Sequence, residues 1–132
     1  MTHALHTFNP QGMAAPGGPY SQGALCRGPG EWLHLSGQVG VDENGEHTDD
    51  FEQQVARTWA NVARVLEEGG MTMGHLVKTV TYVIPDQDLA AMNRVRLEYL
   101  GDARPASTLL VVHALAHPGW RIEVEAVAFK PA

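Results

Sequence analysis

Residues 51–66 read FEQQVARTWANVARVL, and this stretch decides the fold class. Its large apolar residues recur at spacings of three and four, which places them along one side of an α-helix: Phe51, Val55, Trp59, Val62 and Leu66. Asp49 and Glu52 predict a capping box at the start of this helix, and Gly69-Gly70 predicts its end. A helix with one apolar stripe must pack that stripe on another layer, so the flanking segments should supply a sheet.

The flanking segments carry the alternation and the β-branched composition that are typical of strands. We expect strands at residues 31–39, 76–84, 106–114 and 120–129, with one more inside residues 5–25. A second helix is expected over residues 87–100, before Gly101. This order predicts a single α+β domain over residues 1–132, in which both helices lie on one face of a mixed or antiparallel sheet.

Residues 109–112, LLVV, are apolar on both sides of their expected strand. Two helices cover only one face of such a sheet, and a bare apolar sheet face is an association site. We therefore expect a homo-oligomer. Low solubility, or a loop that covers the second face, would also account for the pattern.

The composition limits the classes of partner. The chain has 132 residues, of which 44% are hydrophobic and 18% charged, and its formal charge is −6. Its nine lysines and arginines are scattered along the chain, so nucleic acid is a disfavoured partner. No apolar run approaches the roughly 20 residues that span a bilayer, and the first ten residues lack an apolar signal core. We expect a cytoplasmic protein without a membrane partner.

Six short motifs stand in a fixed order along the chain: GPYSQ at 18–22, SGQ at 36–38, VKT at 77–79, Asn93, RPA at 104–106 and IEVEA at 122–126. In this order and spacing they resemble the Rid (YjgF-type) family of reactive-intermediate deaminases. The resemblance implies a chorismate-mutase-like α+β fold and a homotrimer with sites in the clefts between subunits. It also implies that a small metabolite, an enamine or imine, is hydrolysed to a keto acid and ammonia without a metal or an organic cofactor.

The chain departs from the family pattern at residue 107. The family's deaminases carry an arginine directly after the Pro-Ala pair, where its guanidinium pairs with the substrate carboxylate. Ser107 stands there in this chain, and one hydroxyl cannot replace a fork of charged donors. Losing such a clamp should cost about 2–5 kcal/mol of binding, so we expect an altered substrate range. Arg104 should point to the opposite face of the strand because it lies three residues earlier.

Glu123 and Glu125 alternate along the last expected strand. The pattern alone fits a solvated edge face with Arg121 as an ion-pair neighbour. The resemblance instead assigns Glu123 the catalytic role of orienting and activating a water molecule. Both interpretations remain open on the sequence.

The resemblance also names residues that bind the substrate: Tyr20, Ser36, Gly37, Asn93 and the divergent Ser107. Each has a structural alternative. The ring of Tyr20 can pack at the base of a loop, Ser36-Gly37 can form a strand bulge, and Asn93 can bond neighbouring backbone.

Histidine is frequent, with seven residues. His113 and His117 are four apart, which places two side chains together on a helix but not on a strand that enters a turn, and no third ligand is evident. We therefore predict no metal site. His113 is instead a candidate substrate-binding residue, because a protonated imidazole attracts anions and would compensate for the missing arginine.

Three functions stay open. The first is an enamine or imine deaminase with an altered substrate range. The second is a trimeric module that binds a metabolite without turnover. The third is an endoribonuclease, an activity of some relatives, which the acidic balance disfavours.

Overall fold

The computed structural model describes residues 4–132, which form a four-stranded sheet, a separate two-stranded sheet and two α-helices. Along the chain the elements are β1 (Leu5–Phe8), β2 (Gly23–Cys26), β3 (Gly30–Val39), α1 (Phe51–Glu68), the 3-10 turn η1 (Met73–His75), β4 (Leu76–Val83), α2 (Leu89–Leu100), β5 (Ala106–Val111) and β6 (Ile122–Pro131). The large sheet has the order β3-β6-β4-β5. Its β4–β5 pair is parallel and its other pairs are antiparallel, so the predicted mixed sheet is confirmed.

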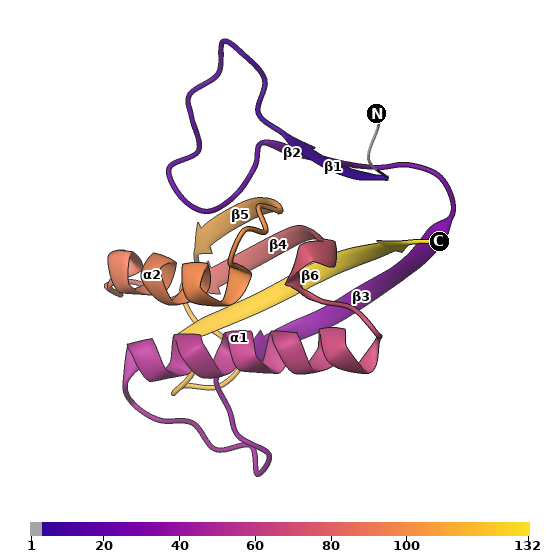
Figure 1. The fold of residues 1–132 in the computed structure, drawn as a ribbon. Coiled ribbons are helices and arrows are strands. Elements are labelled where there is room, and N and C mark those ends of the chain that lie inside the picture. The colour runs from indigo at the N-terminus through magenta and orange to yellow at the C-terminus, as the bar shows by residue number, and fades with distance from the viewer. Residues whose placement is uncertain (1–3) are drawn as a thin grey trace.

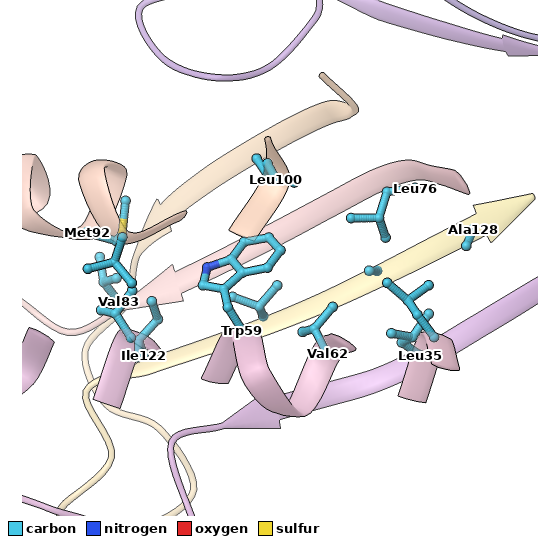
Figure 2. Close-up of a cluster of buried hydrophobic side chains, with 14 of the residues drawn as sticks. Leu35, Trp59, Val62, Leu76, Val83, Met92, Leu100, Ile122 and Ala128 are labelled. Atoms are coloured by element: carbon cyan, nitrogen blue, oxygen red, sulfur yellow. The ribbon is translucent and has the colours of Figure 1, made fainter. Parts of the chain in front are cut away.

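Both helices lie against the same face of this sheet, and the β1–β2 pair forms its own small sheet near the opposite side (Figure 1), where β2 contacts β4 and β1 contacts β6. The core fills the space between helices and sheet, where Trp59 and Val62 of α1 meet β6 and β4 (Figure 2). Along β6 the residues alternate: Ile122 and Val124 are fully buried toward the helices, whereas Glu123 and Glu125 point to the other face.

The start of α1 differs from the sequence prediction. The N-cap is Asp50, whose Oδ2 accepts a hydrogen bond from the backbone N–H of Gln53 at 2.8 Å. The side chain of Asp49 is 97% exposed and makes no capping bond, so the predicted Asp49–Glu52 capping box is wrong. The sequence DD offers two equivalent caps, and the helix begins one residue later than the pattern suggested.

Replacing Asp50 with alanine is therefore expected to lower the free energy of unfolding by about 1 kcal/mol, because an orphan N–H of the first turn loses its acceptor. Urea unfolding followed by circular dichroism measures the change. Asp49→Ala is the matched control and should leave the urea concentration at the midpoint of unfolding unchanged. Equal losses of unfolding free energy in the two variants would contradict the assignment of Asp50 as the N-cap.

Several boundaries also differ from expectation. The strand expected inside residues 5–25 is a pair, β1 and β2, which forms its own antiparallel sheet. β5 ends at Val111, and residues 112–121 form an irregular connection to β6. Trp120 lies in that connection, with its ring stacked on His117 at a centroid distance of 5.3 Å.

β5 is the edge strand of the large sheet and remains poorly covered. Leu109, Leu110 and Val111 are 40%, 45% and 60% exposed. These are the apolar residues from which the sequence predicted association, and they lie on one continuous edge. Within residues 4–132, neither helix combines the length and the apolar character that a membrane span requires.

Candidate functional site

A pocket of about 230 Å³ lies where three segments of the chain meet. The β1–β2 loop, α2 and β5 supply its lining residues: Gly17, Gly18, Tyr20, Asn93, Arg96, Ser107 and Leu109. In Figure 1 this loop lies beside β5, the edge strand of the large sheet. Three of the predicted substrate-binding residues, Tyr20, Asn93 and Ser107, therefore share one pocket.

Backbone bonds hold the loop in place over β5. The N–H of Ser21 donates to the carbonyl of Pro105 at 3.0 Å, and Ser21 forms a bridge with Ala106. One residue earlier, the N–H of Tyr20 bonds the carbonyl of Gly18, and the N–H of Gly17 reaches the Tyr20 hydroxyl at 3.4 Å. The Gly-Pro turn thus fixes the direction of the tyrosine ring toward α2 and β5.

Arg96 lies at the centre of the polar side of this pocket. Its Nη2 donates to Asn93 Oδ1 at 2.6 Å, and its Nη1 lies 3.5 Å from Ser107 Oγ. The Ser107 hydroxyl also accepts a bond from Thr79 Oγ1 at 3.1 Å. Ser107 therefore faces the helices, and its hydroxyl already has protein partners.

Arg96 is only 5% exposed, and among residues 4–132 its Nε has no hydrogen-bond partner. Burial lowers the pKa of Arg96, while the nearby Tyr20 opposes that shift. None of the ion pairs within the described part of the chain involves this guanidinium. The pocket thus contains a buried positive charge that the fold does not neutralise.

Sequence reasoning did not select Arg96 as a site residue. It falls on the side of the second helix that carries Met92 and Val95, and it is buried together with them. A cation among apolar helical positions is the signal that identifies it, because arginine is rarely buried without a partner. Arg104, the arginine nearest to Ser107 in sequence, lies outside the pocket and donates from Nη1 to the carbonyls of Gly101 and Ala103 at 2.7 and 2.8 Å.

The remaining predicted residues lie elsewhere. Glu123 is on the sheet face that points away from the helices, and its carboxylate lies directly over Gly37, where no space remains for a Cβ. Ser36 and Gly37 occupy the irregularity between β3 and β6 that the sequence allowed for, and both are exposed. Beside them, the Tyr82 hydroxyl donates to Glu125 Oε1, and this bond raises the pKa of Tyr82.

The residues predicted for one site thus form two groups on opposite faces of the sheet within a single chain. The pocket group is Tyr20, Asn93 and Ser107, to which the structure adds Arg96. The open-face group is Ser36, Gly37 and Glu123. His113 belongs to neither group, because it is exposed in the connection after β5 and does not line the pocket.

A larger cavity of about 620 Å³ lies between α1 and the loop that follows β3. Its charged residues are Asp42, Glu46 and Arg57, and none of the predicted site residues lines it. The Asp42 carboxylate accepts bonds from the N–H groups of Asn44 and Glu46, which lowers its pKa and closes the turn. The Asp42 carboxylate is therefore used to hold the loop. Because none of the predicted site residues lines the larger cavity, we regard the smaller pocket as the candidate functional site.

Comparison with known proteins gives a consistent result. The sequence profile of the family described as Endoribonuclease L-PSP matches residues 12–130. A RutC family protein of Pyrococcus abyssi is 36% identical over 117 residues, which cover 87% of this chain and 89% of the relative.

Two further similar proteins are a solved structure and a deaminase. The crystal structure of YyfB from Yersinia pestis, a conserved Rid family protein of unknown function, superimposes with a TM-score of 0.84 at 28% identity, covering 96% of this chain and 98% of that one. A 2-iminobutanoate/2-iminopropanoate deaminase of Capra hircus is 29% identical over 113 residues, covering 84% of this chain and 80% of the relative.

Proposed function

The chain belongs to the Rid family, also described as Endoribonuclease L-PSP, and from this premise we propose that it is a deaminase that hydrolyses a small enamine or imine and releases ammonia. The observation that carries the proposal is the pocket in which Tyr20, Asn93 and residue 107 meet. Their side chains supply a phenol, an amide and a hydroxyl, which are groups that orient a small polar molecule. The deaminase among the relatives supports the reaction class.

The reaction needs water and proton transfer but no redox partner. An enamine first takes a proton from solvent on its carbon and becomes an iminium ion. The oxygen of water then adds to the iminium carbon and loses a proton, which gives a carbinolamine. The C–N bond breaks as the nitrogen takes a proton, the hydroxyl returns a proton to solvent, and a carbonyl compound and ammonia leave. In the proposed mechanism Glu123 accepts the proton from the attacking water and returns it to the departing nitrogen.

We further propose that the protein is a homotrimer whose active clefts lie between subunits. Glu123 and Gly37 lie on the open face of the sheet, whereas the pocket opens beside α2 and the edge of β5. A second copy that covers Leu109, Leu110 and Val111 would bury exposed apolar surface at this edge. The same contact would bring an open-face group from one chain to the pocket of its neighbour. Because reactive intermediates of this kind arise in metabolism, we propose a cytoplasmic location.

The proposed substrate range is altered because Ser107 stands where the family's deaminases have arginine. Its hydroxyl is already engaged by Thr79 and lies close to Arg96. A serine in this network cannot form a bidentate contact with a carboxylate. Recognition of the substrate therefore depends on other groups of the pocket.

The test is ammonia release from 2-aminoacrylate generated in the assay by a separate lyase. We expect the protein to accelerate release in proportion to its concentration, above the spontaneous hydrolysis measured without it. Tight binding of the keto-acid product without acceleration would favour a metabolite-binding module instead. Cleavage of RNA, with no effect on the enamine, would favour the endoribonuclease.

A further inference from the structure

We propose that the guanidinium of Arg96, which reaches the pocket from α2, binds the carboxylate of a small organic acid in place of the arginine that residue 107 lacks. The inference rests on the proposed function in one respect, since it names the class of substrate for the same pocket. It concerns binding, so it can be tested separately from turnover.

The first argument is the unsatisfied state of Arg96. A guanidinium has five N–H donors, yet the part of the chain that the structure describes offers this one two acceptors: Asn93 Oδ1 at 2.6 Å and Ser107 Oγ at the long distance of 3.5 Å. Its Nε has no acceptor, and within residues 4–132 no carboxylate pairs with it, although the residue is 95% buried. A buried charge without a partner is strongly unfavourable, so an anion in the pocket would stabilise this arrangement.

The second argument is the contrast with arginines that have a structural role in this chain. Arg94 forms an ion pair with Glu52, and Arg104 donates to two carbonyls after the C-terminal end of α2. Both are more exposed than Arg96, so solvent can reach the donors that their protein partners leave free. Arg96 is the buried member of the three and the one that lines a pocket.

The third argument concerns the kind of anion. The pocket, at about 230 Å³, is smaller than the roughly 300–1,000 Å³ of sites for drug-sized ligands. Leu109 provides an apolar wall, and no second cation lines the pocket within the described residues, which disfavours polyanions. A planar guanidinium matches a carboxylate with two parallel bonds. Gly18 leaves the approach open, because a Cβ at that residue would lie 3.2 Å from Arg96 Nη2.

Isothermal titration of the intact protein with pyruvate, the carboxylate product expected from 2-aminoacrylate, tests the inference. Arg96→Gln should weaken pyruvate binding at least about thirtyfold, as expected for the loss of one partner of a buried charged contact. Arg96→Lys retains the positive charge but cannot form two parallel bonds with a carboxylate. Its affinity for pyruvate should therefore lie between those of Arg96→Gln and wild type. Arg104→Gln is the matched control and should bind pyruvate like wild type.

Two further probes define the ligand. Pyruvamide has the same shape without the charge, and its binding should be weak and equal in wild type and Arg96→Gln. Inorganic phosphate should not compete with pyruvate at comparable concentration. Unchanged pyruvate binding in a folded Arg96→Gln protein would overturn the inference, and so would Arg96-dependent phosphate binding that is tighter than pyruvate binding.

Failure of this inference is distinguishable from failure of the proposed function. Pyruvate binding that depends on Arg96, without any ammonia release, would support the carboxylate site and refute the deaminase. Ammonia release that is unaffected in both Arg96→Gln and Arg96→Lys would support the deaminase and refute the carboxylate site.

Discussion

Glu123→Gln is expected to lower the rate of ammonia release by about 10²–10⁴-fold, the usual contribution of a positioned general acid–base group. Glutamine keeps the size and shape of the side chain but cannot accept a proton from water. Glu123 is half-buried on the open face of β6, so the substitution should leave the free energy of unfolding nearly unchanged. Steady-state ammonia release, together with urea unfolding of the same sample, measures both quantities.

Glu125→Gln is the matched control, because Glu125 lies two residues along the same face and accepts its bond from the Tyr82 hydroxyl. A glutamine oxygen still accepts that bond, so activity should stay near wild type. A second variant, Gly37→Ala, places a methyl group where the Glu123 carboxylate now lies and should lower the rate without removing the acid. Equal losses in the Glu123 and Glu125 variants would show that the rate depends on the charge of this face rather than on Glu123 itself.

Much of the fold could be predicted because the elements carry simple periodic patterns. The stripe from Phe51 to Leu66 determined α1, and the alternation around Glu123 and Glu125 determined which β6 residues face the core. The errors lie at element ends, where local bonds decide the outcome. Two adjacent aspartates offered equivalent caps for α1, and the backbone geometry that selects Asp50 has no sequence signal.

The site was predictable only in part, for a different reason. The motifs identified Tyr20, Asn93 and Ser107, and these three residues line the same pocket. The motifs show that residue 107 is serine where the family's deaminases have arginine. They do not indicate which other residue could take the place of that arginine. Arg96 comes from another element, α2, and only the three-dimensional arrangement reveals that its Nη1 lies 3.5 Å from Ser107 Oγ. The separation of Glu123 from the pocket by the sheet is likewise a property of the topology.

Installing an arginine at residue 107 is expected to destabilise the protein, although a comparison of sequences alone would suggest a gain of function. In Ser107→Arg the new guanidinium enters a pocket in which the buried guanidinium of Arg96 approaches the residue 107 side chain to 3.5 Å. Two like charges in a poorly solvated site repel each other, and neither has a carboxylate to neutralise it. The expected loss is about 3 kcal/mol or more in the free energy of unfolding, comparable to that of a buried charge left without a partner.

The double variant Arg96→Gln/Ser107→Arg removes this repulsion and moves the single guanidinium from α2 to β5. We expect it to be more stable than Ser107→Arg and to recover pyruvate binding that Arg96→Gln loses, so the two substitutions should not be additive. Ser107→Met is the control for volume, since it adds a long side chain without charge. Overpacking rather than charge explains the loss of unfolding free energy if two results are found together. Ser107→Met and Ser107→Arg would be equally destabilised, and adding Arg96→Gln would restore stability to neither. Relief confined to the arginine variant would mean that the pocket accommodates one guanidinium, supplied in this chain by α2.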